Sequence, residues 1–190
     1  MSRPGGTNVV MSEIDSPIGV LVAGATDEGL CLLEFRDREI LETQVAKVRS
    51  RSGLWPIGPT ATGSHPIIAT LNVQLAEYFD GRRRDFALPL VFPGTPFQVK
   101  VWRALRAIPF GETISYEELA RRVDAPSGQR AVGHANGQNP IAIVIPCHRV
   151  VNKSGKLGGY GGGLWRKRLL LDLERASSGR GGQHELFGAA

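Results

Sequence analysis

Short apolar runs alternate with turn signals in the first part of the chain, a pattern typical of strands. Residues 20–25 and 29–35 are two such runs, and the polar residues between them predict a β-hairpin. An earlier strand, broken by a turn, is expected within residues 11–19. Residues 38–51 predict a polar helix, and residues 66–79 carry apolar side chains at helical spacing. This part is predicted to be a small α/β unit, and no catalytic constellation is recognisable in it.

Helical periodicity dominates the second part of the chain. Thr95 and Pro96 supply an N-cap and a first-turn proline for one helix. Ser115 and Glu118 have capping-box spacing at the start of the next helix. A turn and a second short helix at residues 129–135 follow, so the pattern predicts a helix-turn-helix. The pattern alone leaves the function open, because many two-helix corners bind nothing.

The most unusual stretch is residues 141–151, Ile-Ala-Ile-Val-Ile-Pro-Cys-His-Arg-Val-Val. Its apolar run is β-branched and closed by a proline, which predicts a buried strand or extended segment that ends abruptly. Cys147 lies at that end and is followed by His148 and Arg149. A free cysteine is usually a buried, inert packing residue. The adjacent imidazole and guanidinium favour a chemical role for this one.

Charge is unevenly distributed along the chain, whose net charge is +5. Residues 1–96 carry nine Lys or Arg against eleven Asp or Glu, whereas residues 97–175 carry thirteen against six. This asymmetry favours two functional halves, the second facing a polyanion. A solvated basic surface would give the same pattern, so charge alone does not decide.

Two cysteines far apart make no disulfide framework, and no apolar run approaches the length of a membrane span. The N-terminus has no apolar targeting segment. We therefore expect a cytoplasmic protein whose thiols stay reduced. Cys31 and His65 are too few ligands for a structural zinc site in the first half, so we expect no metal.

Several motifs of the second half resemble one family. Pro146-Cys-His-Arg-Val150 is similar to the active-site signature of the O6-alkylguanine-DNA alkyltransferases, the methylated-DNA–protein-cysteine methyltransferases. Further motifs match that family in order and spacing, and together they cover essentially all of residues 95–175: residues 110–116, 130–133, 139–140, 160–164 and 173–174.

The resemblance implies an α/β (α+β) protein of two domains. Residues 1–92 would form a small ribonuclease-H-like domain without that activity, and residues 93–176 a helical active-site domain with a winged helix-turn-helix. Residues 177–190 are rich in Gly and Ser and are expected to be a disordered tail.

The resemblance also implies an activity in DNA repair. The protein would flip O6-alkylguanine, mainly O6-methylguanine, out of duplex DNA and transfer the alkyl group irreversibly to Cys147, once per molecule. The expected partner is duplex DNA, bound in its minor groove by a monomer that is nucleoid-associated when bound. No cofactor and no membrane are expected, and cooperative binding is left open.

Individual roles follow from the matching positions. Cys147 would be the nucleophile, and His148, oriented by Glu174, would draw off its proton through a bound water. Asn139 would fix the turn before the active-site segment. Arg130 would fill the gap left by the flipped nucleotide, and Tyr116 would contact the phosphate and the flipped base. Three further positions would contact the DNA: Ser115, Ala131 and Gly133. The pocket would be lined by Tyr160, Gly161 and Val150.

The residues themselves support this chemistry. An alkyl group on O6 of guanine is an electrophilic carbon, and a thiolate is the best side-chain nucleophile for it. A thiol with a pKa of about 8.5 is mostly protonated at neutral pH and needs a base. Asn136 and Gly161 replace a larger apolar residue and a hydroxyl residue of some relatives, which would alter the pocket.

Two other functions remain open. A binding-only helix-turn-helix protein could recognise damaged DNA, although retention of Cys147, His148 and Glu174 argues against it. A cysteine hydrolase could use the same Cys-His pair, but no oxyanion motif is evident and the basic second half would be unexplained.

Overall fold

The computed structural model describes residues 9–51, 61–62 and 64–179. The N-terminal half is built on a four-stranded sheet with the order β3-β2-β1-β4. β1 pairs antiparallel with β2 and parallel with β4, and β2 pairs antiparallel with β3, which confirms the predicted hairpin. The strands are β1 (Val10–Ile14), β2 (Leu21–Thr26), β3 (Gly29–Phe35) and β4 (Ala61–Thr62).

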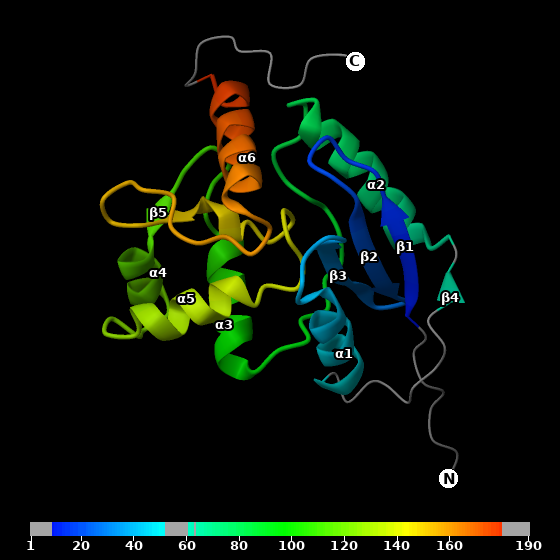
Figure 1. The fold of residues 1–190 in the computed structure, drawn as a ribbon, viewed down its shortest axis with the longest axis horizontal. Coiled ribbons are helices and arrows are strands. Elements are labelled where there is room, and N and C mark those ends of the chain that lie inside the picture. Colours follow the sequence, from blue (N-terminus) through cyan, green and yellow to red (C-terminus); the bar gives the residue numbers. More distant parts are fainter. Residues whose placement is uncertain (1–8, 52–60, 63, 180–190) are drawn as a thin grey trace.

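Two helices accompany this sheet, α1 (Leu41–Arg51) and α2 (Pro66–Phe79) (Figure 1). α2 contacts β2 and β3, while α1 contacts β3. Every residue of β3 is buried, because helices and the second half of the chain cover it. α2 begins where His65 accepts a hydrogen bond from the amide of Ile67, with Pro66 in its first turn.

The second half contains three mutually contacting helices, α3 (Pro96–Arg106), α4 (Tyr116–Arg122) and α5 (Gln129–Gly137). Thr95 is the N-cap of α3, as the sequence predicts, and the structure adds a complete capping box between Thr95 and Gln98. The Ser115 hydroxyl caps α4 by accepting the amide of Glu118 at 3.0 Å. α4, its turn and α5 form the predicted helix-turn-helix.

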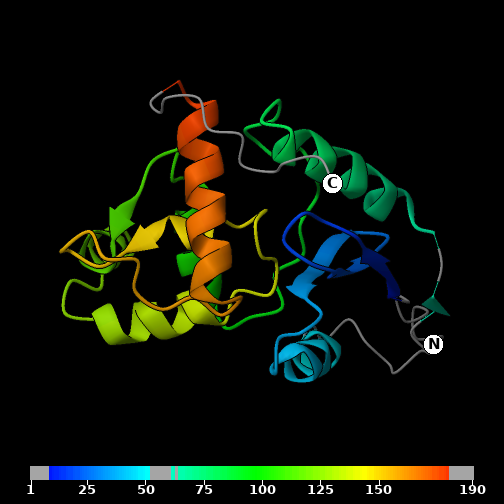
Figure 2. The same ribbon diagram turned by 45° about the horizontal axis from the view of Figure 1, so that its top comes forward.

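The last helix, α6 (Leu164–Ser177), lies between these helices and the N-terminal half (Figures 1 and 2). Beside it, β5 (Ile114–Ser115) and β6 (Val150–Val151) form a small parallel sheet. The expected α/β architecture, a small sheet domain followed by a helical domain, is confirmed. Of the expected tail, residues 177–179 are described, and the rest lies outside the described residues.

The strand or extended segment expected over residues 141–145 is not formed, although the expected burial is present. Ile141 forms a single bridge with Leu33 of β3, and the chain then makes turns, with Ile143 at φ 69°. The short 3-10 helix η1 (Cys147–Arg149) follows. Residues 141–150 are all buried. An apolar run enclosed on all sides looks the same in sequence whether it is a strand or a series of turns.

Within the described ranges, no helix is both long enough and apolar enough to cross a membrane.

Candidate active site and DNA-facing helices

Cys147 is held in place by the turn that precedes it. The Asn139 amide donates to the carbonyl oxygen of Ile145 at 2.8 Å, and its Oδ1 accepts the amide of Ile141 at 3.0 Å. Asn139 is 1 % exposed, so these bonds have little competition from water. The role expected for Asn139, fixing the turn between α5 and the active-site segment, agrees with these contacts.

Glu174 of α6 is the centre of a buried hydrogen-bond cluster behind Cys147. Its Oε1 accepts from Nε2 of His148 at 2.8 Å, from Nη2 of Arg149 at 2.9 Å and from the Tyr78 hydroxyl at 2.8 Å. Its Oε2 accepts from Nε of Arg149 at 2.9 Å and from the amide of Gly111 at 3.1 Å. With five donors around two oxygens, the carboxylate has little freedom to move.

The environment sets the protonation states of these groups. Burial opposes ionisation of Glu174, but hydrogen bonds from His148 and Arg149 outweigh it and hold the pKa of Glu174 well below its usual range. Burial lowers the pKa of His148, against the opposing pull of Glu174, so the ring is neutral at pH 7. Because Nε2 faces Glu174, the proton of the neutral ring lies there. Nδ1 is buried and has no partner among the described residues, so its lone pair is free.

The Cys147 thiol itself is protonated at rest. Burial raises its pKa, and the hydrogen bond with Asn139 offsets only part of this effect. A base is therefore needed when the sulfur reacts. The free Nδ1 of the neighbouring His148 is suited to that task.

Cys147, which is 7 % exposed, lines a cavity of about 230 Å³. The cavity reaches the surface, because Gly137, Gly159 and Gly161 at its rim are exposed. Both halves of the chain line it: Glu34, Phe35, Arg38, Tyr116, Gly133, Asn136, Gly137, Asn139, Ala142, Cys147, Gly159, Tyr160, Gly161 and Gly162. The thiol is thus reachable beside α4 and α5.

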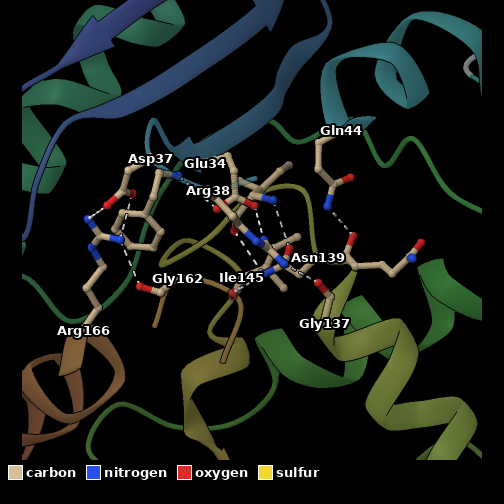
Figure 3. Close-up of polar contacts among 12 residues, drawn as sticks. Glu34, Asp37, Arg38, Gln44, Gly137, Asn139, Ile145, Gly162 and Arg166 are labelled. Carbon is tan, nitrogen blue, oxygen red and sulfur yellow. Dashed lines mark hydrogen bonds and ion pairs between the residues drawn. The ribbon is translucent and has the colours of Figure 1, made fainter. Parts of the chain in front are cut away.

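The N-terminal half contributes an ion pair to this cavity (Figure 3). Arg38 is paired with the fully buried carboxylate of Glu34 and donates to the carbonyl oxygen of Gly137 at 2.7 Å. A Cβ on Gly161 would lie 2.0 Å from Nη2 of Arg38, so the guanidinium occupies the space that a side chain at position 161 would need. No sequence motif predicted that Glu34 and Arg38 would line the cavity, because both belong to the half without recognised motifs.

Two buried cations tie down the loop over residues 157–163. Arg166 donates to the carbonyl oxygen of Gly162 at 3.0 Å and pairs with Asp37 at 2.8 Å (Figure 3). Lys167 donates to the carbonyl oxygens of Val150, at 2.6 Å, and of Leu157. Burial lowers the pKa of Lys167 to about 8. The glycine-rich loop is therefore anchored at both ends.

Tyr160 and Tyr116 frame the cavity from the loop and from α4. The Tyr160 hydroxyl is buried without a partner in the part of the chain that the structure describes, and burial raises its pKa well above the usual value. The Tyr116 ring packs close to Gly133, where an added Cβ would lie 3.7 Å from Cε1. Both tyrosines were expected in the pocket and line the cavity, as does Gly161, whereas Val150 does not.

The side chains expected to meet DNA lie on the outer face of the helix pair. Arg130 and Ala131 of α5 are exposed, and Gly133, one turn further, lies at the cavity. Ser115 is half-buried and caps α4. The exposed surface of α5 therefore continues directly into the wall of the cavity.

No group of three or more His, Cys, Asp or Glu side chains that could hold a metal ion occurs in the described ranges.

Several residues of the site were not predicted from the sequence: Tyr78, Lys167 and the Glu34–Arg38 pair. A helical stripe shows that Tyr78 is buried, but nothing local indicates that its hydroxyl would face Glu174.

Comparisons with known proteins agree with this geometry. Residues 9–92 match the family model "6-O-methylguanine DNA methyltransferase, ribonuclease-like domain" and residues 96–176 the model "6-O-methylguanine DNA methyltransferase, DNA binding domain". A methylated-DNA–protein-cysteine methyltransferase of Mycolicibacterium paratuberculosis is 48% identical over 87% of this chain and 92% of its own length. One from Methanosarcina acetivorans is 38% identical over 84% and 94% of the two chains.

Solved structures give the same result. The crystal structure of Mycobacterium tuberculosis OGT in complex with DNA is 44% identical, with a TM-score of 0.72 over 87% of this chain and 92% of that one. A hyperthermophilic archaeal O6-methylguanine-DNA methyltransferase has a TM-score of 0.62 at 25% identity, over 87% and 98%. Because both halves match in sequence and in fold, the chain belongs to the family of 6-O-methylguanine DNA methyltransferases.

Proposed function

We propose that this protein repairs O6-alkylguanine in duplex DNA by transferring the alkyl group irreversibly to Cys147, once per molecule. The observation that carries the proposal is the position of the sulfur. Cys147 lines a cavity that residues of the helix pair also line, and the next residue is a neutral histidine whose Nε2 is fixed by Glu174 and whose Nδ1 has no partner among the described residues.

The transfer is a displacement at the alkyl carbon. Nδ1 of His148 takes the thiol proton through one bridging water, because side chains of adjacent residues are poorly placed for direct contact. The sulfur forms a bond to the alkyl carbon as the bond between that carbon and O6 breaks. The electron pair of the broken bond stays on the guanine. The guanine takes up one proton and becomes normal guanine. The product on Cys147 is a thioether, whose carbon–sulfur bond does not exchange with thiols or hydrolyse, so Cys147 stays alkylated.

The DNA would be bound through the minor groove by α5. Arg130, which is exposed, would fill the gap left by the flipped nucleotide, and the small exposed side chain of Ala131 would permit close approach to the groove floor. Tyr116, between α5 and the cavity, would contact the flipped base. The relative of known structure in complex with DNA supports this partner.

The remaining expectations are proposed with this function. The cavity and the cluster around Glu174 are formed by residues of one chain, which supports action as a monomer on DNA. A cytoplasmic location is proposed together with this function. Residues 1–92 and 93–176 are proposed as the two domains, in keeping with family matches at 9–92 and 96–176.

The test is intact mass spectrometry after mixing the protein with excess duplex DNA that contains one O6-methylguanine. We expect one added methyl group per molecule, located on the Cys147 peptide, and none with Cys147→Ser. Repaired DNA in large excess over protein would show a turnover enzyme. Tight binding with the methyl group left on the DNA would show a binding-only protein. Either result would overturn the proposal.

A further inference from the structure

The hydroxyl of Tyr78 reaches the active site from the N-terminal half. Tyr78 lies near the C-terminal end of α2, which approaches α6 in both ribbon views (Figures 1 and 2). Its hydroxyl donates to Oε1 of Glu174 at 2.8 Å, the same oxygen that holds Nε2 of His148. The side chain is 0 % exposed, and its ring is fixed edge-on against Phe79 and Phe110.

We propose that Tyr78 is a positioning residue for alkyl transfer: by donating to Oε1 of Glu174, it limits the negative charge that this oxygen presents to His148 and so sets the basicity of Nδ1. This inference rests on the proposed function, because it assigns Tyr78 a part in activating Cys147. It also gives the N-terminal half a direct part in the chemistry, besides its place in the cavity wall.

The direction of the effect follows from the hydrogen bonds. Without the Tyr78 hydroxyl, more negative charge on Oε1 would face Nε2 of His148 and favour the imidazolium form. Glu174 would remain ionised, because Arg149 still donates to both of its oxygens. Removing the hydroxyl should therefore raise the pKa of His148. As the pH falls, the ring would then become protonated, and stop acting as a base, at a higher pH than in the wild type.

The other ionisable groups that face this cluster keep the same charge over the pH range in which His148 titrates. Burial, followed by the charge of Glu174, raises the pKa of Tyr78 well above 10, so its hydroxyl stays a donor. Arg149 of η1 and Lys167 of α6 are the cations that act on His148, and the amide of Gly111 is the remaining donor to Glu174. Lys167, with a pKa of about 8, is protonated where His148 titrates.

The experiment compares wild type with Tyr78→Phe, which keeps the ring and its packing. Single-turnover methyl transfer is measured against pH with excess protein over methylated duplex. We expect the acid limb of the rate profile to move to higher pH by roughly 0.5–1 unit. This is only a fraction of the full effect of losing one hydrogen bond to a charged group, because the change reaches His148 through Glu174. Ring ¹⁵N spectra of His148, assigned among the four histidines with His148→Gln, should show the same shift.

Gln74→Met is the matched control. Gln74 lies one turn earlier on α2, is buried, and exchanges two hydrogen bonds with the backbone of Ala87. The variant removes these two bonds and leaves the contacts of Glu174 unchanged. Its acid limb should stay in place even if its stability falls. Fluorotyrosine at position 78, a stronger donor, should move the limb to lower pH.

The outcomes are distinct. A uniformly slower Tyr78→Phe protein with an unmoved acid limb and an unmoved His148 titration would overturn the inference and leave Tyr78 a packing residue. If Tyr78→Phe does not fold, an unmoved limb with fluorotyrosine would overturn it equally. A wild type that gains no methyl group would overturn the proposed function instead, and the His148 titration would still decide the role of Tyr78.

Discussion

Arg38 donates a hydrogen bond to the carbonyl oxygen of Gly137 at 2.7 Å, and so joins the N-terminal half to the last residue of α5 (Figure 3). Gln44 makes a second such bond, to the carbonyl oxygen of Gln138 at 3.2 Å. The C-terminal end of a helix has free carbonyl groups and favours a nearby cation. The helix that carries Arg130 is therefore held at its far end by the other half of the chain.

Replacing Arg38 by methionine should destabilise the protein. The substitution leaves the carboxylate of Glu34 buried without its cation, and breaking a buried pair in this way costs about 3–5 kcal/mol. Burial already raises the pKa of Glu34, and the cation opposes this. Urea unfolding at pH 7 measures the loss. The double variant Arg38→Met, Glu34→Gln should recover most of it, and a double variant as unstable as the single one would contradict the explanation.

A serine at position 161 should displace Arg38. The new Cβ would lie 2.0 Å from Nη2 of Arg38, so the guanidinium must move and lose its bond to Gly137. We expect a loss of about 1–2 kcal/mol in the free energy of unfolding. Gly159→Ser is the control, because nothing lies within 4 Å of a Cβ there. Equal stability of the two variants would show that Arg38 adapts freely.

The contribution of Glu174 to stability should depend on pH in a defined direction. Its pKa is lowered in the folded protein from 4.5, so its ionised form stabilises the fold above about pH 4.5. Glu174→Gln should cost about 3 kcal/mol at pH 7, because Arg149 loses its charge partner. The difference from wild type should shrink as the pH falls below 4.5. Unfolding curves of both proteins at several pH values measure it.

Asp172→Asn is the control for that series. Asp172 lies on the same helix, but it is partly exposed, and its Oδ1 is 3.9 Å from Nη1 of Arg175, a long distance for an ion pair. Its removal should change the free energy of unfolding by less than about 0.5 kcal/mol at any of these pH values. If the difference in the free energy of unfolding between wild type and Glu174→Gln stayed constant down to pH 2, the lowered pKa of Glu174 would be contradicted.

Removal of the Arg130 side chain should impair repair of duplex DNA selectively. If this side chain fills the gap left by the flipped nucleotide, Arg130→Ala should slow transfer from duplex by about tenfold or more. Transfer from a short single strand, where no gap forms, should change little. Arg122→Ala removes another exposed arginine, on α4, and serves as the control. Equal slowing on both substrates would argue against gap filling.

Local signals in the sequence were sufficient for many elements. Three local predictions depend on residues within a few positions of one another: the hairpin of β2 and β3, the N-cap at Thr95 and the cap at Ser115. All three are present, although the cap at Ser115 consists only of the bond from the Glu118 amide to the Ser115 hydroxyl. The run at 141–145 misled the prediction. Complete burial makes every position apolar, and the periodicity that separates strands from turns is then lost.

The reacting group and its immediate neighbours can be identified from the sequence, because Cys147, His148 and Arg149 are adjacent and the family's motifs are contiguous. The groups that surround them are known only from the three-dimensional fold. Glu34 and Arg38 come to the cavity, and Tyr78 to Glu174, from over seventy residues away in the chain. Such contacts depend on how the two halves dock, through the bridge of Leu33 to Ile141 and the core they share. No pattern within one segment can encode that docking, since each side chain involved also satisfies the rules of its own element.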